Sequence, residues 1–185
     1  MDVRSNAYLL LGISYYIYST KDTSYLPLAK ALAESILDLS ERVKIGSQTL
    51  NLIKEEPDSN YFSLEDNILT YAALREFSKV LGQKDIYRKQ LRDIEKFVKL
   101  LWNPKDKKFY RGYDKYDGKD WIFITRIPLL VSLVWDKDWI KRNLKTSPEE
   151  IIEKVLKEAR ISVKEGKLLA ATNKNNPELK REKDK

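Results

Sequence analysis

Cysteine and histidine are both absent from this chain of 185 residues. Without cysteine there can be no disulfide, no thiol nucleophile and no cysteine-ligated zinc or iron–sulfur site. Without histidine there can be no Ser-His-Asp triad and no imidazole acting as metal ligand, acid or base. Any catalysis must therefore rest on carboxylates, lysine, tyrosine or arginine.

Glycine is scarce, with 6 residues widely scattered. The sequence contains neither the G-x-x-x-x-G-K nor the G-x-G-x-x-G pattern that cradles phosphate groups. Asp114, Asp117 and Asp120 are spaced by threes in one segment, but no EF-hand pattern surrounds them. We therefore expect neither a cofactor nor a bound metal.

Long hydrophobic runs are also missing. The apolar run at 7–18 is too short to span a bilayer, which takes about 20 residues. It is rich in tyrosine, and Ser19-Thr20-Lys21-Asp22 follows it where a signal peptide would have a small-residue cleavage site. We interpret the run as the first core helix, and we expect no membrane span and a cytoplasmic location.

Apolar and charged residues are both plentiful. The chain is 42% hydrophobic and 34% charged, with 35 Lys+Arg against 28 Asp+Glu. This composition supports one packed domain and suits a hot environment. Residues after 166 are polar, so we predict a helical-hairpin domain at 1–166 and a flexible polar tail at 167–185.

Apolar spacing predicts six helices that are alternately buried and amphipathic. Their approximate ranges are 5–19, 25–42, 64–81, 85–102, 121–135 and 148–164. Pro128 predicts a kink in the fifth helix, and Ser147-Pro148-Glu149-Glu150 predicts a capped start for the sixth.

The two helices of each predicted pair are joined by a turn in which Lys-Asp is followed by an aromatic residue. These turns begin at Lys21, Lys84 and Lys137. The predicted fold is therefore all-α, with three antiparallel helical hairpins. The two long connections are predicted as a polar loop at 43–62 and a small β-hairpin within 103–120. An irregular helical bundle is the alternative fold.

Several short motifs resemble the six-hairpin glycosidase-like (α/α) toroid proteins. They are the segments 6–12 and 19–26 for one hairpin, and 63–67, 97–103 and 108–113 for the next. The resemblance covers about residues 5–135 and amounts to half of such a toroid, because this chain has three predicted hairpins instead of six. It implies a protein that binds or processes carbohydrate, with a glycan as ligand.

The same resemblance implies that Glu65 and Asp66, at the start of a buried helix, face a sugar cleft as acid/base carboxylates. An inverting mechanism needs a second carboxylate about 6.5–9.5 Å away, which Asp120 or Asp114 could supply. The alternative is structural, because acidic residues after Ser63 also suit a capped helix start.

Other residues extend this candidate site. Arg126 is the only charged residue between Trp121 and Trp135, so it is either an ion-pair partner of Glu65 or Asp66 or a substrate contact. We expect Tyr61, Tyr113 and Trp121 to stack on sugar rings, with Arg111 beside them; alternatively the aromatic rings cap the core. The tyrosines at 8, 15, 16 and 18 are predicted to be mostly core.

Two functions from other classes remain open. One is a non-catalytic helical scaffold that associates with itself or binds a protein partner, because three hairpins leave two flanks uncovered. The other is binding of single-stranded nucleic acid through the basic and aromatic segment 105–119. We rank nucleic acid last, because four aspartates dilute that segment and the net charge of +7 is spread along the chain.

Overall fold

The structure is a computed structural model that describes residues 2–120, 122, 124 and 126–159. Its contacts divide the chain into two compact units, residues 1–101 with 110–120 and residues 102–109 with 121–185. The predicted tail at 167–185 lies outside the described residues. Within the described part, no helix combines the length and the apolar character that a bilayer span requires.

The described chain is mainly helical, with small antiparallel sheets. The helices are α1 (Val3–Thr20), α2 (Leu26–Leu37), α3 (Leu64–Val80), α4 (Arg88–Leu100), α5 (Arg126–Val134), α6 (Lys137–Leu144) and α7 (Pro148–Ala159). The strands are β1 (Ser40–Ile45), β2 (Gln48–Ile53), β3 (Tyr61–Ser63), β4 (Trp102–Asn103), β5 (Lys108–Phe109), β6 (Gly112–Asp114) and β7 (Gly118–Asp120).

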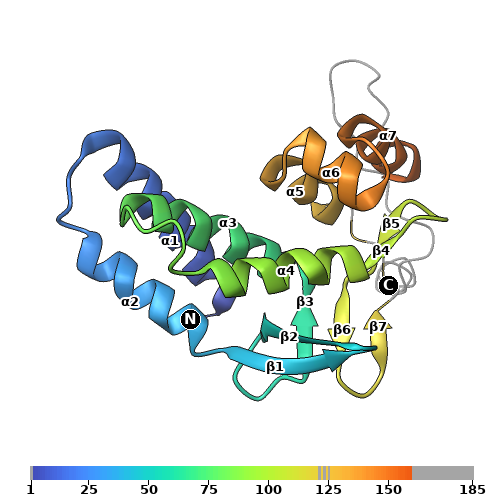
Figure 1. The fold of residues 1–185 in the computed structure, drawn as a ribbon, viewed down its shortest axis with the longest axis horizontal. Helices are drawn as coiled ribbons and strands as arrows, with labels where there is room; N and C mark the ends of the chain where they lie inside the picture. The colour runs from blue at the N-terminus through green and yellow to red at the C-terminus, as the bar shows by residue number, and fades with distance from the viewer. Residues whose placement is uncertain (1, 121, 123, 125, 160–185) are drawn as a thin grey trace, which may run out of the picture. The chain divides into compact units, whose positions relative to one another are not determined.

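Helix α3 is the centre of the first unit. Every residue from Leu64 to Leu74 is buried, and α3 contacts α1, α2 and α4 (Figure 1). Ser63 caps its start by accepting a hydrogen bond from the Asp66 N–H at 3.3 Å, and Gly82, at φ +65°, follows its end. The predicted buried helix at 64–81 is therefore confirmed.

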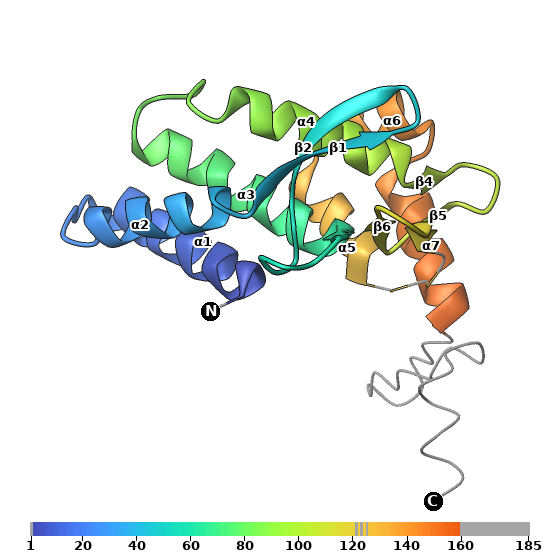
Figure 2. The same ribbon diagram turned by 90° about the horizontal axis from the view of Figure 1, so that it is seen from below.

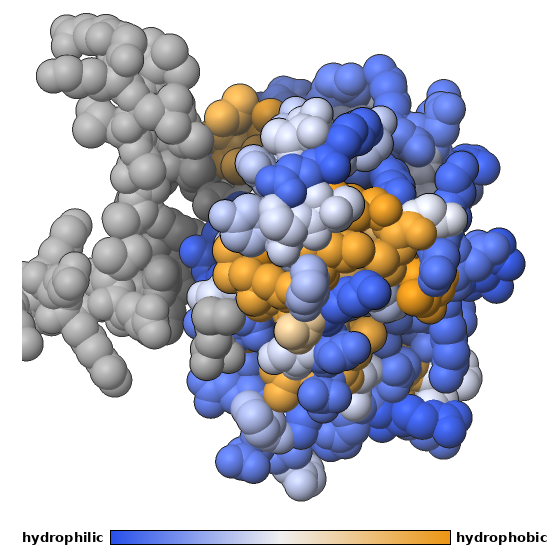
Figure 3. Space-filling view, turned by 90° about the vertical axis from the view of Figure 1, so that its left-hand side faces the viewer, coloured by the Kyte–Doolittle hydropathy of each residue, from blue (hydrophilic) through white to orange (hydrophobic). Residues whose placement is uncertain are grey.

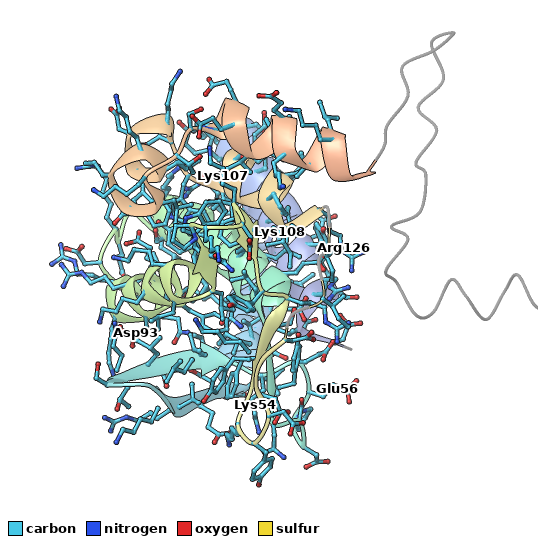
Figure 4. The ribbon with its side chains drawn as sticks, turned by 90° about the vertical axis from the view of Figure 1, so that its right-hand side faces the viewer. Lys54, Glu56, Asp93, Lys107, Lys108 and Arg126 are labelled. Carbon is cyan, nitrogen blue, oxygen red and sulfur yellow. The ribbon has the colours of Figure 1, made fainter. Side chains whose placement is uncertain are left out.

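The polar loop predicted at 43–62 is wrong for its first half, and so is the predicted end of the second helix. Residues 40–53 form the antiparallel strands β1 and β2 around a turn at Gly46 (φ +60°). Val43 and Ile45 are buried while Arg42 and Lys44 are exposed, which is the two-residue period of a half-buried strand. The hairpin packs on α4, where Asp93 lies on the side that faces it (Figure 4).

The predicted burial of α1 on all sides is also wrong. One side, including Ala7, Leu10 and Ile17, packs against α2 and α3, and Figure 2 shows the three helices side by side. The opposite side is open to solvent. The tyrosines predicted to be core are exposed there, by 51% at Tyr8 and 74% at Tyr15, and Tyr16 and Tyr18 are exposed as well.

The second unit contains α5, α6, α7 and the β4–β5 pair. Trp102 packs on Phe109 with ring centroids 4.7 Å apart and donates a hydrogen bond to the Leu144 carbonyl. Pro128 lies in the first turn of α5, where its missing N–H removes no hydrogen bond within the helix. The helix α6 was not predicted, and α5 packs with α7, so the count of three hairpins stays a prediction.

Asn67 joins the end of β2 to the first turn of α3. Its side-chain oxygen accepts a hydrogen bond from the Ile53 N–H at 3.0 Å, and its amide group donates to the carbonyls of Ile53 and Ser63, both at 2.9 Å. The side chain is fully buried. This amide therefore sets where the segment after β2 meets the start of α3.

Replacing Asn67 with alanine is expected to lower the free energy of unfolding by about 2–4 kcal/mol, because two buried backbone groups of Ile53 lose their partner. Urea denaturation measures the loss. Asn143→Ala is the matched control, since Asn143 makes one hydrogen bond, within α6, and is half-buried; it should cost less than about 1 kcal/mol. Equal losses in the two variants would contradict this role for Asn67.

Candidate functional site

A pair of buried carboxylates opens helix α3. Glu65 is 4% exposed and Asp66 is 1% exposed. Arg4, in the first turn of α1, donates a hydrogen bond from Nε to Asp66 Oδ1 at 2.7 Å, and its Nη2 lies 3.6 Å from Glu65 Oε2. The hydrogen bond to Asp66 raises the pKa of Arg4, so this guanidinium stays charged. The cation that pairs with these acids thus comes from α1.

A second polar cluster lies on the three-stranded sheet β3–β6–β7. Arg111 Nε is 2.8 Å from Asp120 Oδ2 and donates to the Tyr61 hydroxyl at 3.1 Å. The Tyr61 hydroxyl donates in turn to Asp120 Oδ2 at 3.1 Å, and the Arg111 guanidinium lies 5.5 Å from the Tyr61 ring centroid. Burial raises the pKa of Tyr61, so its hydroxyl keeps its proton.

Gly112 makes this cluster possible. A Cβ at Gly112 would lie 2.4 Å from the Tyr61 hydroxyl oxygen and 2.6 Å from the Phe62 carbonyl oxygen, distances that atoms do not tolerate. The glycine therefore lets the Tyr61 ring lie against the backbone of β6. Any side chain at this position would displace the ring from Arg111 and Asp120.

The backbone brings the two clusters to the same end of the first unit. Ser63, which caps α3, is paired with Gly112 in the register of β3 and β6. The Leu64 N–H donates to the Arg111 carbonyl at 2.9 Å, so the start of α3 is bonded directly to the segment that carries Arg111. We call the combined group of Arg4, Glu55, Tyr61, Glu65, Asp66, Arg111 and Asp120 the α3 site.

Glu55 is the third carboxyl group beside the start of α3. It follows β2, is half-buried, and its backbone N–H donates to the Tyr61 carbonyl at 3.2 Å. Burial raises its pKa, the negative charge of Asp66 raises it further, and Arg4 and Arg111 oppose the rise. The Glu55 carboxyl therefore holds its proton more tightly than an ordinary solvated glutamate does.

The structure brings together five of the eight residues predicted for the site, namely Tyr61, Glu65, Asp66, Arg111 and Asp120. Tyr113 lies on β6 beside them, but strand alternation directs it to the opposite face from Gly112 and Asp120. Trp121 lies outside the described residues.

Arg126 belongs to the second unit, where it is the first residue of α5. It was predicted as a lone charge within an apolar helix, and it lies exposed at the start of that helix; its role as an ion-pair partner of Glu65 or Asp66 or as a substrate contact stays a prediction. Asp114 was the alternative second carboxylate. It accepts hydrogen bonds from the backbone N–H groups of Tyr116 and Asp117 and so shapes the β6–β7 turn.

Sequence reasoning missed Arg4 and Glu55. The signal for Arg4 was its position as the only basic residue before the uncharged run that forms α1. Glu55 gave no comparable signal, since Glu55-Glu56-Pro57-Asp58 resembles a solvated loop. No group of three or more acidic side chains that could hold a metal ion occurs in the described part of the chain.

No protein-family description and no curated protein matches the sequence. Solved structures do match the fold. The GH76A alpha-1,6-mannanase from Salegentibacter sp. HEL1_6 superposes with a TM-score of 0.60 at 16% identity, over 91% of this chain and 48% of that chain. An inactive variant of that enzyme, with two consecutive aspartates changed to alanine and alpha-1,6-mannotetrose bound, also gives 0.60, at 15% identity over 93% of this chain and 49% of that chain.

These matches establish a fold and not an activity, because the identities are low. The chain has the fold of part of a six-hairpin glycosidase-like α/α toroid, as the sequence resemblance predicts. It spans about half the length of the mannanase chain.

The ion pair between Arg4 and Asp66 can be measured with a double-mutant cycle. Asp66→Asn is expected to cost about 1.5–3 kcal/mol of unfolding free energy, because a hydrogen bond between charged groups is lost. Arg4→Met should cost less once Asp66 is already asparagine, giving a coupling energy of about 1–3 kcal/mol. The exposed pair Glu76–Lys79 is the control, with a coupling below about 1 kcal/mol; a coupling this small for Arg4–Asp66 would contradict the assignment.

The raised pKa of Glu55 predicts a pH-dependent stability. The folded chain binds a proton at Glu55 more tightly than the unfolded chain, so this residue lowers stability as pH rises from about 4.3 through the raised pKa. Glu55→Gln should therefore raise the melting temperature at pH 7 and leave it unchanged at pH 3. The control is Glu56→Gln, at the exposed neighbouring position. If Glu55→Gln melts lower than the parent at pH 7, the direction of the shift is wrong.

Proposed function

We propose that this chain binds and processes carbohydrate, with the α3 site as the place where a sugar is held. The observation that carries the proposal is a pair of consecutive carboxylates, Glu65 and Asp66, at the start of a buried helix in a glycosidase-like toroid fold. In the similar mannanase, a variant that lacks two consecutive aspartates is inactive. An α-1,6-linked mannose oligosaccharide is therefore the first substrate to test.

The side chains of the α3 site differ in their exposure to solvent. Arg111, Tyr61 and Glu55 are partly exposed, and a guanidinium beside an aromatic ring can hold a sugar by hydrogen bonds and stacking. Glu65 and Asp66 lie beneath Arg4, whose side chain is 36% exposed. In this proposal the sugar contacts the sheet cluster first, and Arg4 must leave Asp66 before that carboxylate can act.

Hydrolysis needs one proton donor and one proton acceptor. Water adds through its oxygen to the anomeric carbon, the carbon–oxygen bond to the leaving sugar breaks, an acid protonates the leaving oxygen, and a base accepts a proton from the water. Glu55 suits the acid because its pKa is raised. Asp66, Glu65 or Asp120 would serve as the base.

Calorimetry with α-1,6-mannotetraose, together with product analysis, tests the proposal. Arg111→Met should weaken binding at least about tenfold, because a charged hydrogen bond contributes about 1.5–3 kcal/mol. Asp66→Asn and Glu55→Gln should abolish turnover while binding persists. Lys107→Met is the control, since Lys107 is an exposed residue of the second unit that pairs with Glu150. A parent chain that neither binds nor cleaves millimolar tetrasaccharide would remove this substrate, and failure across a panel of glycans would remove the function.

A non-catalytic scaffold is the second candidate, and one observation favours it. Arg4 pairs with both buried acids, which is also what a residue in a purely structural ion pair would do. For a scaffold, Asp66→Asn would lower the melting temperature, and no glycan binding would be found in the parent.

A further inference from the structure

The outer face of α1 contains a groove that the proposed carbohydrate function does not use. It has a volume of about 690 Å³ and lies between α1 and the last turns of α3. Its lining residues are Tyr8, Leu11, Gly12, Ser14, Tyr15, Tyr18, Glu76 and Lys79. Apolar side chains gather on the molecular face that includes the α1–α2 end (Figure 3). We call this feature the α1 groove.

The floor of the α1 groove is open at Gly12. A Cβ on Gly12 would meet no atom within 4 Å, so the glycine leaves space that no residue in the described part of the chain fills. Tyr15 is 74% exposed and Tyr18 is 61% exposed, so both rings project from the same helix face. Tyrosine is enriched where proteins meet, because it offers a large contact area and a hydroxyl at modest entropic cost.

The distribution of charged residues indicates what kind of partner would bind to the α1 groove. No charged residue occurs from Ser5 to Thr20, although 34% of the whole chain is charged. Two copies with a net charge of +7 each could meet on this face without placing like charges together. At the rim, Glu76 and Lys79 carry opposite charges 2.7 Å apart. A rim that carries both signs of charge is electrostatically complementary to the same rim of a second copy across a two-fold axis.

We propose that the α1 groove is the surface through which two copies of this chain associate around a two-fold axis, with the α1 helices crossing at Gly12. Tyr15 of one copy fills the space above Gly12 of the other.

Sedimentation equilibrium over about two decades of concentration, ~1–100 µM, tests the proposal on the full chain. The parent should show twice the chain mass of 21.7 kDa. Gly12→Arg should weaken the dimer at least about 30-fold, because it fills the crossing point and adds a charge there. Arginine favours helix more than glycine does, so circular dichroism should show an unchanged fold.

Two further variants make the result specific. Gly12→Ala is the graded variant at the same position, because its one methyl group meets no atom of its own chain within 4 Å and should weaken the dimer far less than arginine does. Tyr116→Arg, at a turn residue that is 82% exposed, is the control for adding an arginine elsewhere. Tyr15→Glu should also give a monomer, because it introduces a charge into the apolar contact.

Other results would overturn the proposal. A parent chain that is monomeric at the highest concentration means that something else covers the groove, such as the unit that contains α5 and α7. Masses above the dimer that grow with concentration mean a head-to-tail contact, which does not close on itself. A dimer that survives both Gly12→Arg and Tyr15→Glu uses another surface.

Discussion

The polar first turn of a buried helix is the constraint on which the rest of the first unit depends. Helix α3 is enclosed by other elements, yet it begins with Ser63, Glu65, Asp66 and Asn67, all of which are buried. Buried polar groups without partners are costly. The Ser63 side chain bonds locally to the Asp66 N–H, Arg4 of α1 pairs with the two carboxylates, and Asn67 binds Ile53 at the end of β2. These bonds help to determine which elements pack against the start of α3.

The same bonds produce the local chemistry. Because Asn67 holds the end of β2 at the start of α3, Glu55 lies where the charge of Asp66 acts on it, and burial raises its pKa. Gly112 allows the Tyr61 ring to approach β6, so Arg111 and Asp120 meet at its hydroxyl. Carboxyl groups of one type thereby acquire different environments, which is a requirement for dividing acid and base roles.

The sequence predicted those features that depend on local spacing. The apolar spacing located α3 and α4, and capping residues such as Ser63 and Ser147 accept the expected backbone hydrogen bonds. The prediction from sequence failed where the local spacing of apolar residues is ambiguous. The charged residues Arg42 and Lys44 resemble a solvated loop until β1 is seen to pack on one side only. The residues of α1 are apolar nearly all round, so their spacing did not indicate which side of the helix other elements would cover.

By itself, the sequence determined that the chain is mainly helical, that it resembles a six-hairpin glycosidase-like toroid, and that any chemistry must rest on carboxylates, tyrosine or basic residues. Residue types and short-range periodicity are enough for those conclusions. Only the tertiary structure decided that Arg4 pairs with Asp66, 62 residues away, that Glu55 joins the same site, and that the tyrosines of α1 face outward. These features depend on which elements become neighbours. Packing between segments that are far apart in the sequence decides which residue pairs with a buried charge.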